Sequence, residues 1–128
     1  MPTFFDAETS DAQIEKFARF GFSARKIGVE IGRLDMGDSE IFTLLHGFRQ
    51  STFITRDSDF YRKANRHARY GLVFLDTPHA EVANHARRLF RHQQFDTAAK
   101  RCGKVIRVTP TKVHWFELGN EAEQAVDS

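Results

Sequence analysis

The chain has 128 residues, of which 41% are hydrophobic and 28% are charged, and it contains 13 phenylalanines. This size and composition predict one compact domain and exclude a disordered chain. No apolar run is long enough to span a membrane, and no basic stretch followed by an apolar segment begins the chain, so we expect a cytoplasmic protein with no membrane partner. One cysteine excludes an internal disulfide, and the six histidines lack the spacing typical of zinc sites.

The net charge of +2 conceals an uneven distribution of charge along the chain. Residues 60–112 carry 12 Lys and Arg against three Asp and Glu, whereas residues 113–128 carry four acids and no Lys or Arg. A basic central segment is typical of a protein whose partner carries phosphates. An ordinary solvated surface has the same composition, so charge alone leaves both interpretations open.

Hydrophobic periodicity, capping residues and glycine-rich breaks divide the chain into alternating strands and helices. Ser10 and Gln13 form a capping-box pattern at the first helix, and the dipeptide Thr77-Pro78 begins the longest one. In chain order we expect a strand at 3–5, a helix at 11–20, a short strand within 22–30, a helix at 38–49, a strand at 51–55, a polar helical turn at 60–69, a strand at 72–75, a long helix after residue 78, and a hairpin of strands at 104–108 and 112–118.

This alternation predicts the α/β class, with a mostly parallel central sheet, helices on both faces and a C-terminal β-hairpin at one edge. We expect a single domain over residues 1–119, followed by a disordered acidic tail at 120–128. In such sheets, ligands bind beyond the carboxyl ends of the strands where the strand order reverses. Asp6, Asp57 and Asp59 follow two of the predicted strands and are therefore candidate site residues.

Glu40, in the first turn of the helix predicted at residue 38, is a fourth candidate acid. Clustered carboxylates repel one another and raise each other's pKa unless a cation neutralises them. Oxygen ligands suit Mg²⁺ or Mn²⁺, which also bind substrate phosphates, so the cluster indicates phosphodiester chemistry with one of these ions as cofactor. Taken singly, each acid also has a structural explanation, as a turn residue or as a partner of the helix dipole.

Three motifs carry a resemblance to a known family: Phe-Phe-Asp-Ala-Glu at residues 4–8, Gly-Asp-Ser-Glu-Ile at 37–41 and Thr-Arg-Asp-Ser-Asp-Phe at 55–60. Together with Gly103–Val108 before the closing strand, they resemble the PIN-like superfamily, especially its short branch of uncharacterised bacterial proteins. The resemblance covers nearly the whole chain. It implies a three-layer α/β/α PIN-like fold and a Mg²⁺- or Mn²⁺-dependent endoribonuclease, often the toxin of a toxin/antitoxin pair.

The resemblance also implies roles for individual residues. The catalytic, metal-binding acids would be Asp6, Glu40, Asp57 and Asp59. Glu8 and Asp38 would support them, or replace Glu40 if its side chain points away, and Thr55 would lie beside them. Apart from the resemblance, position in the chain suggests the substrate contacts, because a basic run begins directly after the turn at Asp57 and Asp59. The expected contacts are Arg56, Arg62, Lys63 and Arg66, with Arg69 in the same run.

The expected partners are RNA, a cognate antitoxin and a second copy of the chain, the last through whichever of Trp115 and Phe116 faces solvent. The arginines and histidines of the long helix form a further cationic face that is compatible with a nucleic-acid backbone. A solvated helix face is the alternative explanation for this pattern.

Two other functional classes stay open. A phospho-receiver domain is similar in length and sheet type; Asp57 would then accept the phosphoryl group and Thr77 would be the switch hydroxyl. The lysine–proline pair typical of the last receiver strand is missing, because Lys104 begins its strand and Pro110 follows Thr109. The other class is a catalytically silent PIN-like module that binds RNA or a partner protein.

Overall fold

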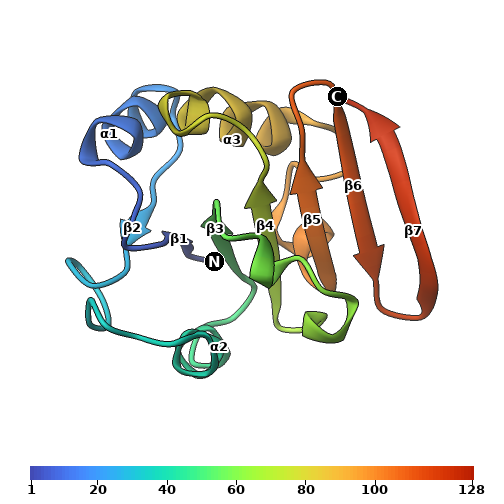
Figure 1. The fold of residues 1–128 in the computed structure, drawn as a ribbon, viewed down its shortest axis with the longest axis horizontal. Coiled ribbons are helices and arrows are strands. Elements are labelled where there is room, and N and C mark those ends of the chain that lie inside the picture. The colour runs from blue at the N-terminus through green and yellow to red at the C-terminus, as the bar shows by residue number, and fades with distance from the viewer.

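One seven-stranded sheet extends through the chain, with helices on both of its faces (Figure 1). The computed structural model describes all residues, 1–128. The strand order is β2-β1-β3-β4-β5-β6-β7; the first five strands are parallel to one another, and β6 is antiparallel to both of its neighbours, β5 and β7. The strands are β1 (Thr3–Phe5), β2 (Arg25–Lys26), β3 (Ser51–Thr55), β4 (Tyr70–Leu75), β5 (Lys104–Val108), β6 (Lys112–Glu117) and β7 (Asn120–Asp127).

The predicted α/β class and mostly parallel sheet are confirmed. None of the helices is long and apolar enough to cross a membrane. The segment predicted as a polar helical turn at 60–69 contains short 3₁₀ turns instead, and another 3₁₀ turn precedes the longest helix. The helices are α1 (Asp11–Arg19), α2 (Asp38–His46), α3 (Val82–Arg91) and α4 (Ala98–Arg101), and the 3₁₀ turns are η1 (Ser58–Phe60), η2 (Lys63–Asn65) and η3 (His79–Glu81).

Alternation along the buried strands divides the core between the two faces of the sheet. Phe5 and Ile54 belong to the cluster under α1 and α3, whereas Phe4 and Phe53 belong to the cluster under α2. Figure 1 shows α1 and α3 together on one side of the sheet and α2 on the other. Helices therefore cover both faces of the sheet, so side chains that form a site must lie beyond the ends of its strands.

The hairpin aromatics follow the same alternation, as predicted. Trp115 packs into the α1–α3 cluster, and Phe116 packs against the α2 cluster with its ring 5.6 Å from that of Tyr61. Trp115 is only 6% exposed, and Phe116 is half-buried. Neither side chain forms an exposed aromatic surface, so the structure does not supply the dimer contact predicted from them.

The prediction of a disordered acidic tail is wrong, because residues 120–127 form β7. This strand pairs with β6 from Lys112 opposite Asp127 to Trp115 opposite Gln124. Most of its side chains are exposed, so it has no hydrophobic pattern that sequence periodicity can detect. Its stability comes from the backbone ladder and from ion pairs, one of which joins Lys63 to Glu121 at 2.9 Å.

Ser10 caps α1 as predicted, accepting a hydrogen bond from the backbone N of Gln13 at 3.3 Å. The side chain of Gln13 does not return to Ser10. Its Oε1 accepts a hydrogen bond from the backbone N of Ala83 at 2.9 Å, in the first turn of α3. Gln13 thus satisfies a free N–H of α3 and connects the two helices.

The strand order places a switch point at β1, which has β2 on one side and β3 on the other. The parallel strands follow the order 2-1-3-4-5, one of the two common doubly wound arrangements, in which ligands bind beyond the carboxyl ends of the strands flanking this point. Asp6 comes directly after β1, where its backbone N donates to Ile54 O of β3 at 3.0 Å. Asp57 lies two residues beyond the end of β3.

Candidate active site

Local hydrogen bonds orient the Asp6 carboxylate. Its Oδ1 accepts from the backbone N of Glu8 at 2.9 Å and from the hydroxyl of Thr9 at 3.2 Å. Its Oδ2 accepts from the hydroxyl of Thr55, at the end of the neighbouring strand β3. Three donors from two segments therefore hold one acid at the carboxyl edge of the sheet.

Asp57 is held by the same edge of β3. Its backbone N donates to the Thr55 hydroxyl at 3.0 Å, and its Oδ1 accepts from the backbone N of Asp59 at 2.9 Å, as the cap of η1. Its Oδ2 has no hydrogen-bond partner in the chain. Asp57 therefore keeps one carboxylate oxygen available to a ligand.

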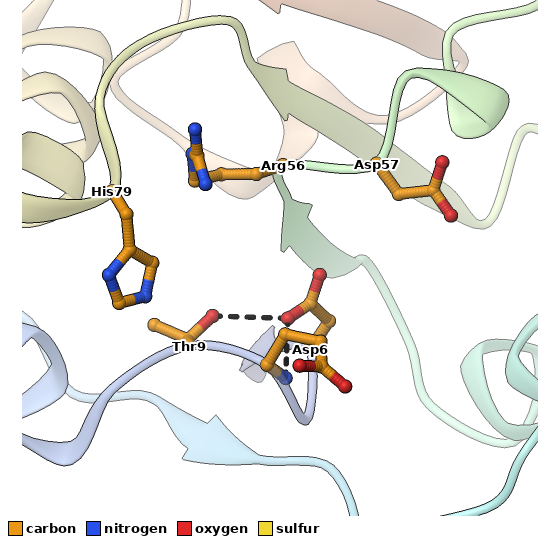
Figure 2. Close-up of a pocket in the computed structure, with 6 residues that line it drawn as sticks. Asp6, Thr9, Arg56, Asp57 and His79 are labelled. Atoms are coloured by element: carbon orange, nitrogen blue, oxygen red, sulfur yellow. Dashed lines mark hydrogen bonds between the residues drawn. The ribbon is translucent and has the colours of Figure 1, made fainter.

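The two acids line a polar cavity of about 250 Å³ that has no hydrophobic residue in its wall. Figure 2 shows Asp6 and Thr9 on one side of it, and Arg56, Asp57 and His79 arranged around them. A second hollow, of about 170 Å³, shares Asp6, Glu8 and Asp57 with the first and adds Asp38 and Thr55 to its wall. Four acids thus surround two adjoining hollows: Asp6, Glu8, Asp38 and Asp57.

The structure does not bring Glu40 to this site. Its Oε1 accepts from the backbone N of Gly37, the N-cap of α2, at 3.3 Å, and its Oε2 is paired with Arg33. Its side chain lines a different hollow, together with Met36 and Thr43. The prediction of Glu40 as a site acid is therefore corrected. The spacing Gly-x-x-Glu at the start of α2 already carries the signal for this structural role.

Asp38, the first residue of α2, takes the place expected for Glu40. Loss of hydration is the largest cause that raises the pKa of its carboxyl, followed by the negative charges of Asp57 and Asp59, while Arg62 lowers it. Like charges that raise a carboxyl pKa are the electrostatic condition that a cation relieves. Asp38 is thus coupled to the acids beyond β3.

Asp59 lies outside both hollows. Its carboxylate pairs with Arg62 at 3.5 Å, and both side chains are exposed. It influences the site through its backbone bond to Asp57 and through its charge on Asp38.

Of the predicted substrate contacts, only Arg56 lines the cavity. Its Nε donates to Thr77 O at 2.9 Å, which fixes the guanidinium at the wall, and the side chain has no carboxylate partner. Lys63 and Arg66 are instead bound to the β6–β7 hairpin, where Arg66 Nη1 donates to Glu117 O at 2.7 Å.

His79 is a cavity residue that the sequence analysis left unassigned. It belongs to η3, just beyond the end of β4, and so reaches the same edge of the sheet as the acids. Its position four residues beyond the end of a parallel strand is the signal that points to it.

The site fits a hard divalent cation because its carboxylates offer oxygen ligands. The neighbouring negative charges also disfavour the ionised form of Asp38, and a bound cation would relieve this repulsion. The ligand set is not assembled, however: no three His, Cys, Asp or Glu side chains are close enough together to hold an ion. Binding of a metal would therefore require these side chains to move closer together.

No family model, curated protein or solved structure matches this chain. The resemblance to the PIN-like superfamily therefore rests on the motifs at residues 4–8, 37–41 and 55–60.

Proposed function

We propose that this protein is a Mg²⁺- or Mn²⁺-dependent endoribonuclease of the PIN-like type, acting as the toxin of a toxin/antitoxin pair. One observation carries the proposal: Asp6, Asp38 and Asp57 come from three separate segments to adjoining hollows at the switch point of the sheet. Arg56 and His79 lie in the same wall. Acids beside a fixed guanidinium are components that phosphodiester hydrolysis needs.

Asp6, Asp38 and Asp57 would hold the ion, with Glu8 and Asp59 close by. A bound Mg²⁺ or Mn²⁺ supplies Lewis-acid stabilisation of charge on a phosphate oxygen. The three donors on Asp6 keep that carboxylate in place, whereas the free Oδ2 of Asp57 and the side chain of Asp38 can adjust.

Arg56 would bind and orient the substrate phosphate. Its Nε is occupied by Thr77 O, which leaves the terminal nitrogens to donate to an anion in the cavity. A guanidinium with no carboxylate partner keeps its charge for the substrate. His79, across the same cavity, can donate to a phosphate oxygen or exchange a proton there.

The experiment is cleavage of end-labelled single-stranded RNA by the wild type, Asp57→Asn and Asp127→Asn, in Mg²⁺, in Mn²⁺ and in EDTA. Asp127 is 91% exposed in its side chain and lies on β7, outside both hollows, so its variant matches the charge change. Cleavage that needs metal, is lost in Asp57→Asn and persists in Asp127→Asn supports the proposal. Metal-independent cleavage, or full activity of Asp57→Asn, contradicts it.

Binding of Mn²⁺, measured by calorimetry on the same three proteins, gives a readout that does not depend on turnover. We expect Asp57→Asn to weaken binding and Asp127→Asn to leave it unchanged. A folded wild type that neither binds Mn²⁺ nor cleaves RNA would favour the silent binding module.

A phospho-receiver domain is the second candidate. The strand order 2-1-3-4-5 is also that of receiver domains. Thr77, two residues beyond β4, is 6% exposed, and its Oγ1 has no hydrogen-bond partner, as a switch hydroxyl would require. No lysine lines either hollow, which disfavours this function. Stable labelling of Asp57 by acetyl phosphate, absent in Asp57→Asn, would support it.

A further inference from the structure

The outer face of α3 carries three arginines, Arg87, Arg88 and Arg91, that pair with no carboxylate. Of the 19 lysines and arginines in the chain, eight have a carboxylate within 4.0 Å and eleven, including these three, have none. The lysines and arginines that have a carboxylate within 4.0 Å are Lys26, Arg33, Arg62, Lys63, Arg66, Lys100, Arg107 and Lys112. The charge of α3 therefore stays available to a partner.

Arg88 is held in place by neutral groups. Its Nη1 donates to Pro110 O at 2.8 Å and to the hydroxyl of Ser128, and its Nη2 donates to Thr109 O. Its Nε is buried and has no partner. Carbonyl and hydroxyl oxygens orient a guanidinium without cancelling its charge, so Arg88 is a fixed positive centre at the middle of the helix face.

Aromatic rings hold the other two arginines. The guanidinium carbon of Arg87 lies 4.0 Å from the ring centroid of Phe20, and that of Arg91 lies 6.0 Å from the ring centroid of Phe22. A cation over an aromatic face is attracted by the ring and loses little of its net charge. Arg87 and Arg91 are four residues apart and are therefore neighbours on the surface of α3, with about 5–6 Å between their Cβ atoms.

These arginines border a broad hollow of about 690 Å³. Its wall contains no hydrophobic residue and no Asp or Glu side chain. The nearest acid on the helix, Glu81, is 3.5 Å from His85 at the helix start. The residues of this α3 cationic face are Asn84, His85, Arg87, Arg88, Arg91, His92 and Ser128.

We propose that the α3 cationic face binds the phosphodiester backbone of a single RNA strand. Fixed, unneutralised arginines in a polar, water-accessible wall are suited to successive phosphates. The absence of apolar side chains disfavours a lipid surface, which needs buried apolar area. His79 lines the acidic cavity and lies three residues before α3, so the helix leads away from the proposed catalytic site.

The identity of this strand as the nuclease substrate rests on the proposed function, whereas binding itself does not. The test therefore measures binding of a fluorescent single-stranded RNA by anisotropy in EDTA, where metal-dependent cleavage cannot occur. It compares the wild type with Arg87→Gln/Arg91→Gln. The matched control, Arg49→Gln/Lys104→Gln, removes two charges near the amino ends of β3 and β5.

We expect the α3 double variant to weaken binding about tenfold or more near 100 mM salt. The dependence of the logarithm of the association constant on the logarithm of the salt concentration should become less steep by about 1.4. Two phosphate contacts are removed, and each contact on a single strand contributes about 0.7 to the slope. The control should keep the wild-type slope. The inference would be overturned if the two double variants bound the RNA equally tightly. It would also be overturned if polyglutamate displaced the fluorescent RNA as effectively as unlabelled RNA of the same charge.

Failure of the nuclease proposal would look different. If no protein cleaves RNA while the α3 double variant still loses binding, the cationic face stands and the catalytic proposal falls. If cleavage and its metal dependence hold while the α3 variant binds normally, only the α3 inference falls.

Discussion

The hydroxyl of Thr55 donates a hydrogen bond to Oδ2 of Asp6, a residue 49 positions away in the chain. The same hydroxyl accepts a hydrogen bond from the backbone N of Asp57 at 3.0 Å. One side chain, 2% exposed, thus joins the acid beyond β1 to the acid beyond β3. The site depends on strand pairing because its two sides meet at this hydroxyl.

Replacing Thr55 by Val should destabilise the protein. The change keeps the shape of the side chain but leaves the Asp57 N–H without its acceptor and removes a donor from Asp6. Loss of such partners costs about 1–3 kcal/mol for a buried group. The free energy of unfolding in urea, compared between the variant and the wild type, measures this loss. Thr43→Val, whose hydroxyl donates to Ser39 O on an exposed helix face, should change stability by less than about 0.5 kcal/mol.

Thr55→Ser supplies the second comparison, because it restores the hydroxyl. It should recover the Mn²⁺ affinity that Thr55→Val loses. Equal metal affinity in the Val and Ser variants would show that the hydroxyl does not position the acids.

Asp38 and Glu40 should differ in their effect on metal-dependent cleavage. Asp38→Asn removes an acid from the hollow that contains Asp6 and Asp57, so we expect cleavage to fall at least tenfold. Glu40→Gln should leave cleavage within about twofold of wild type, since Glu40 caps α2 and pairs with Arg33. The RNA cleavage rates of the two variants in Mn²⁺, each compared with the wild type, test this prediction. The opposite order would restore Glu40 as the site acid.

The stability of the protein should depend on the ionisation of Asp38. Its pKa is raised in the folded state by lost hydration and by Asp57 and Asp59, so its ionised form favours unfolding. Below the pKa of about 3.9 that Asp38 has in the unfolded chain, its carboxyl is neutral in both states and does not reduce the free energy of unfolding. As pH rises through the folded pKa, the carboxyl ionises in the folded protein as well and the free energy of unfolding falls. Asp38→Asn should therefore gain urea resistance over wild type between about pH 3.5 and 7.

Added Mg²⁺ should reduce this advantage of Asp38→Asn at pH 7, because the ion neutralises the wild-type acids. Asp127→Asn, remote from the hollows, serves as the control at each pH. A constant difference between Asp38→Asn and wild type over the whole range would refute the electrostatic coupling.

Arg66→Gln should loosen the β6–β7 hairpin and leave catalysis intact. The substitution removes donors to Glu117 O at 2.7 Å and Asn120 O at 3.0 Å, together with the contact to Glu121. We expect faster amide exchange in β7 and a loss of about 1–3 kcal/mol in unfolding free energy. Hydrogen exchange and RNA cleavage are the paired measurements. A raised KM for RNA with unchanged exchange would restore Arg66 as a substrate contact.

Local pattern was enough to predict much of the fold. The alternation of short apolar runs with amphipathic segments predicted the parallel sheet, and Ser10 marked the start of α1 correctly. The strand-end rule also selected Asp6 and Asp57, because the carboxyl ends of parallel strands meet at one edge whatever the detailed packing. These features depend on periods of two or three to four residues, which a sequence displays directly.

Side-chain partners depended on the tertiary structure. Asp38 and Glu40 are two residues apart in the first turn of α2, and the position of that helix places Asp38, rather than Glu40, in the hollow that contains Thr55. Likewise, Lys63 and Arg66 follow the acids in sequence but bind β7, a strand without hydrophobic periodicity. The sequence by itself determined the strands up to β6 and the acids that follow β1 and β3, but it did not reveal β7. Their charge partners were decided by the tertiary structure, since electrostatic contacts depend on distance in space and leave no period along the chain.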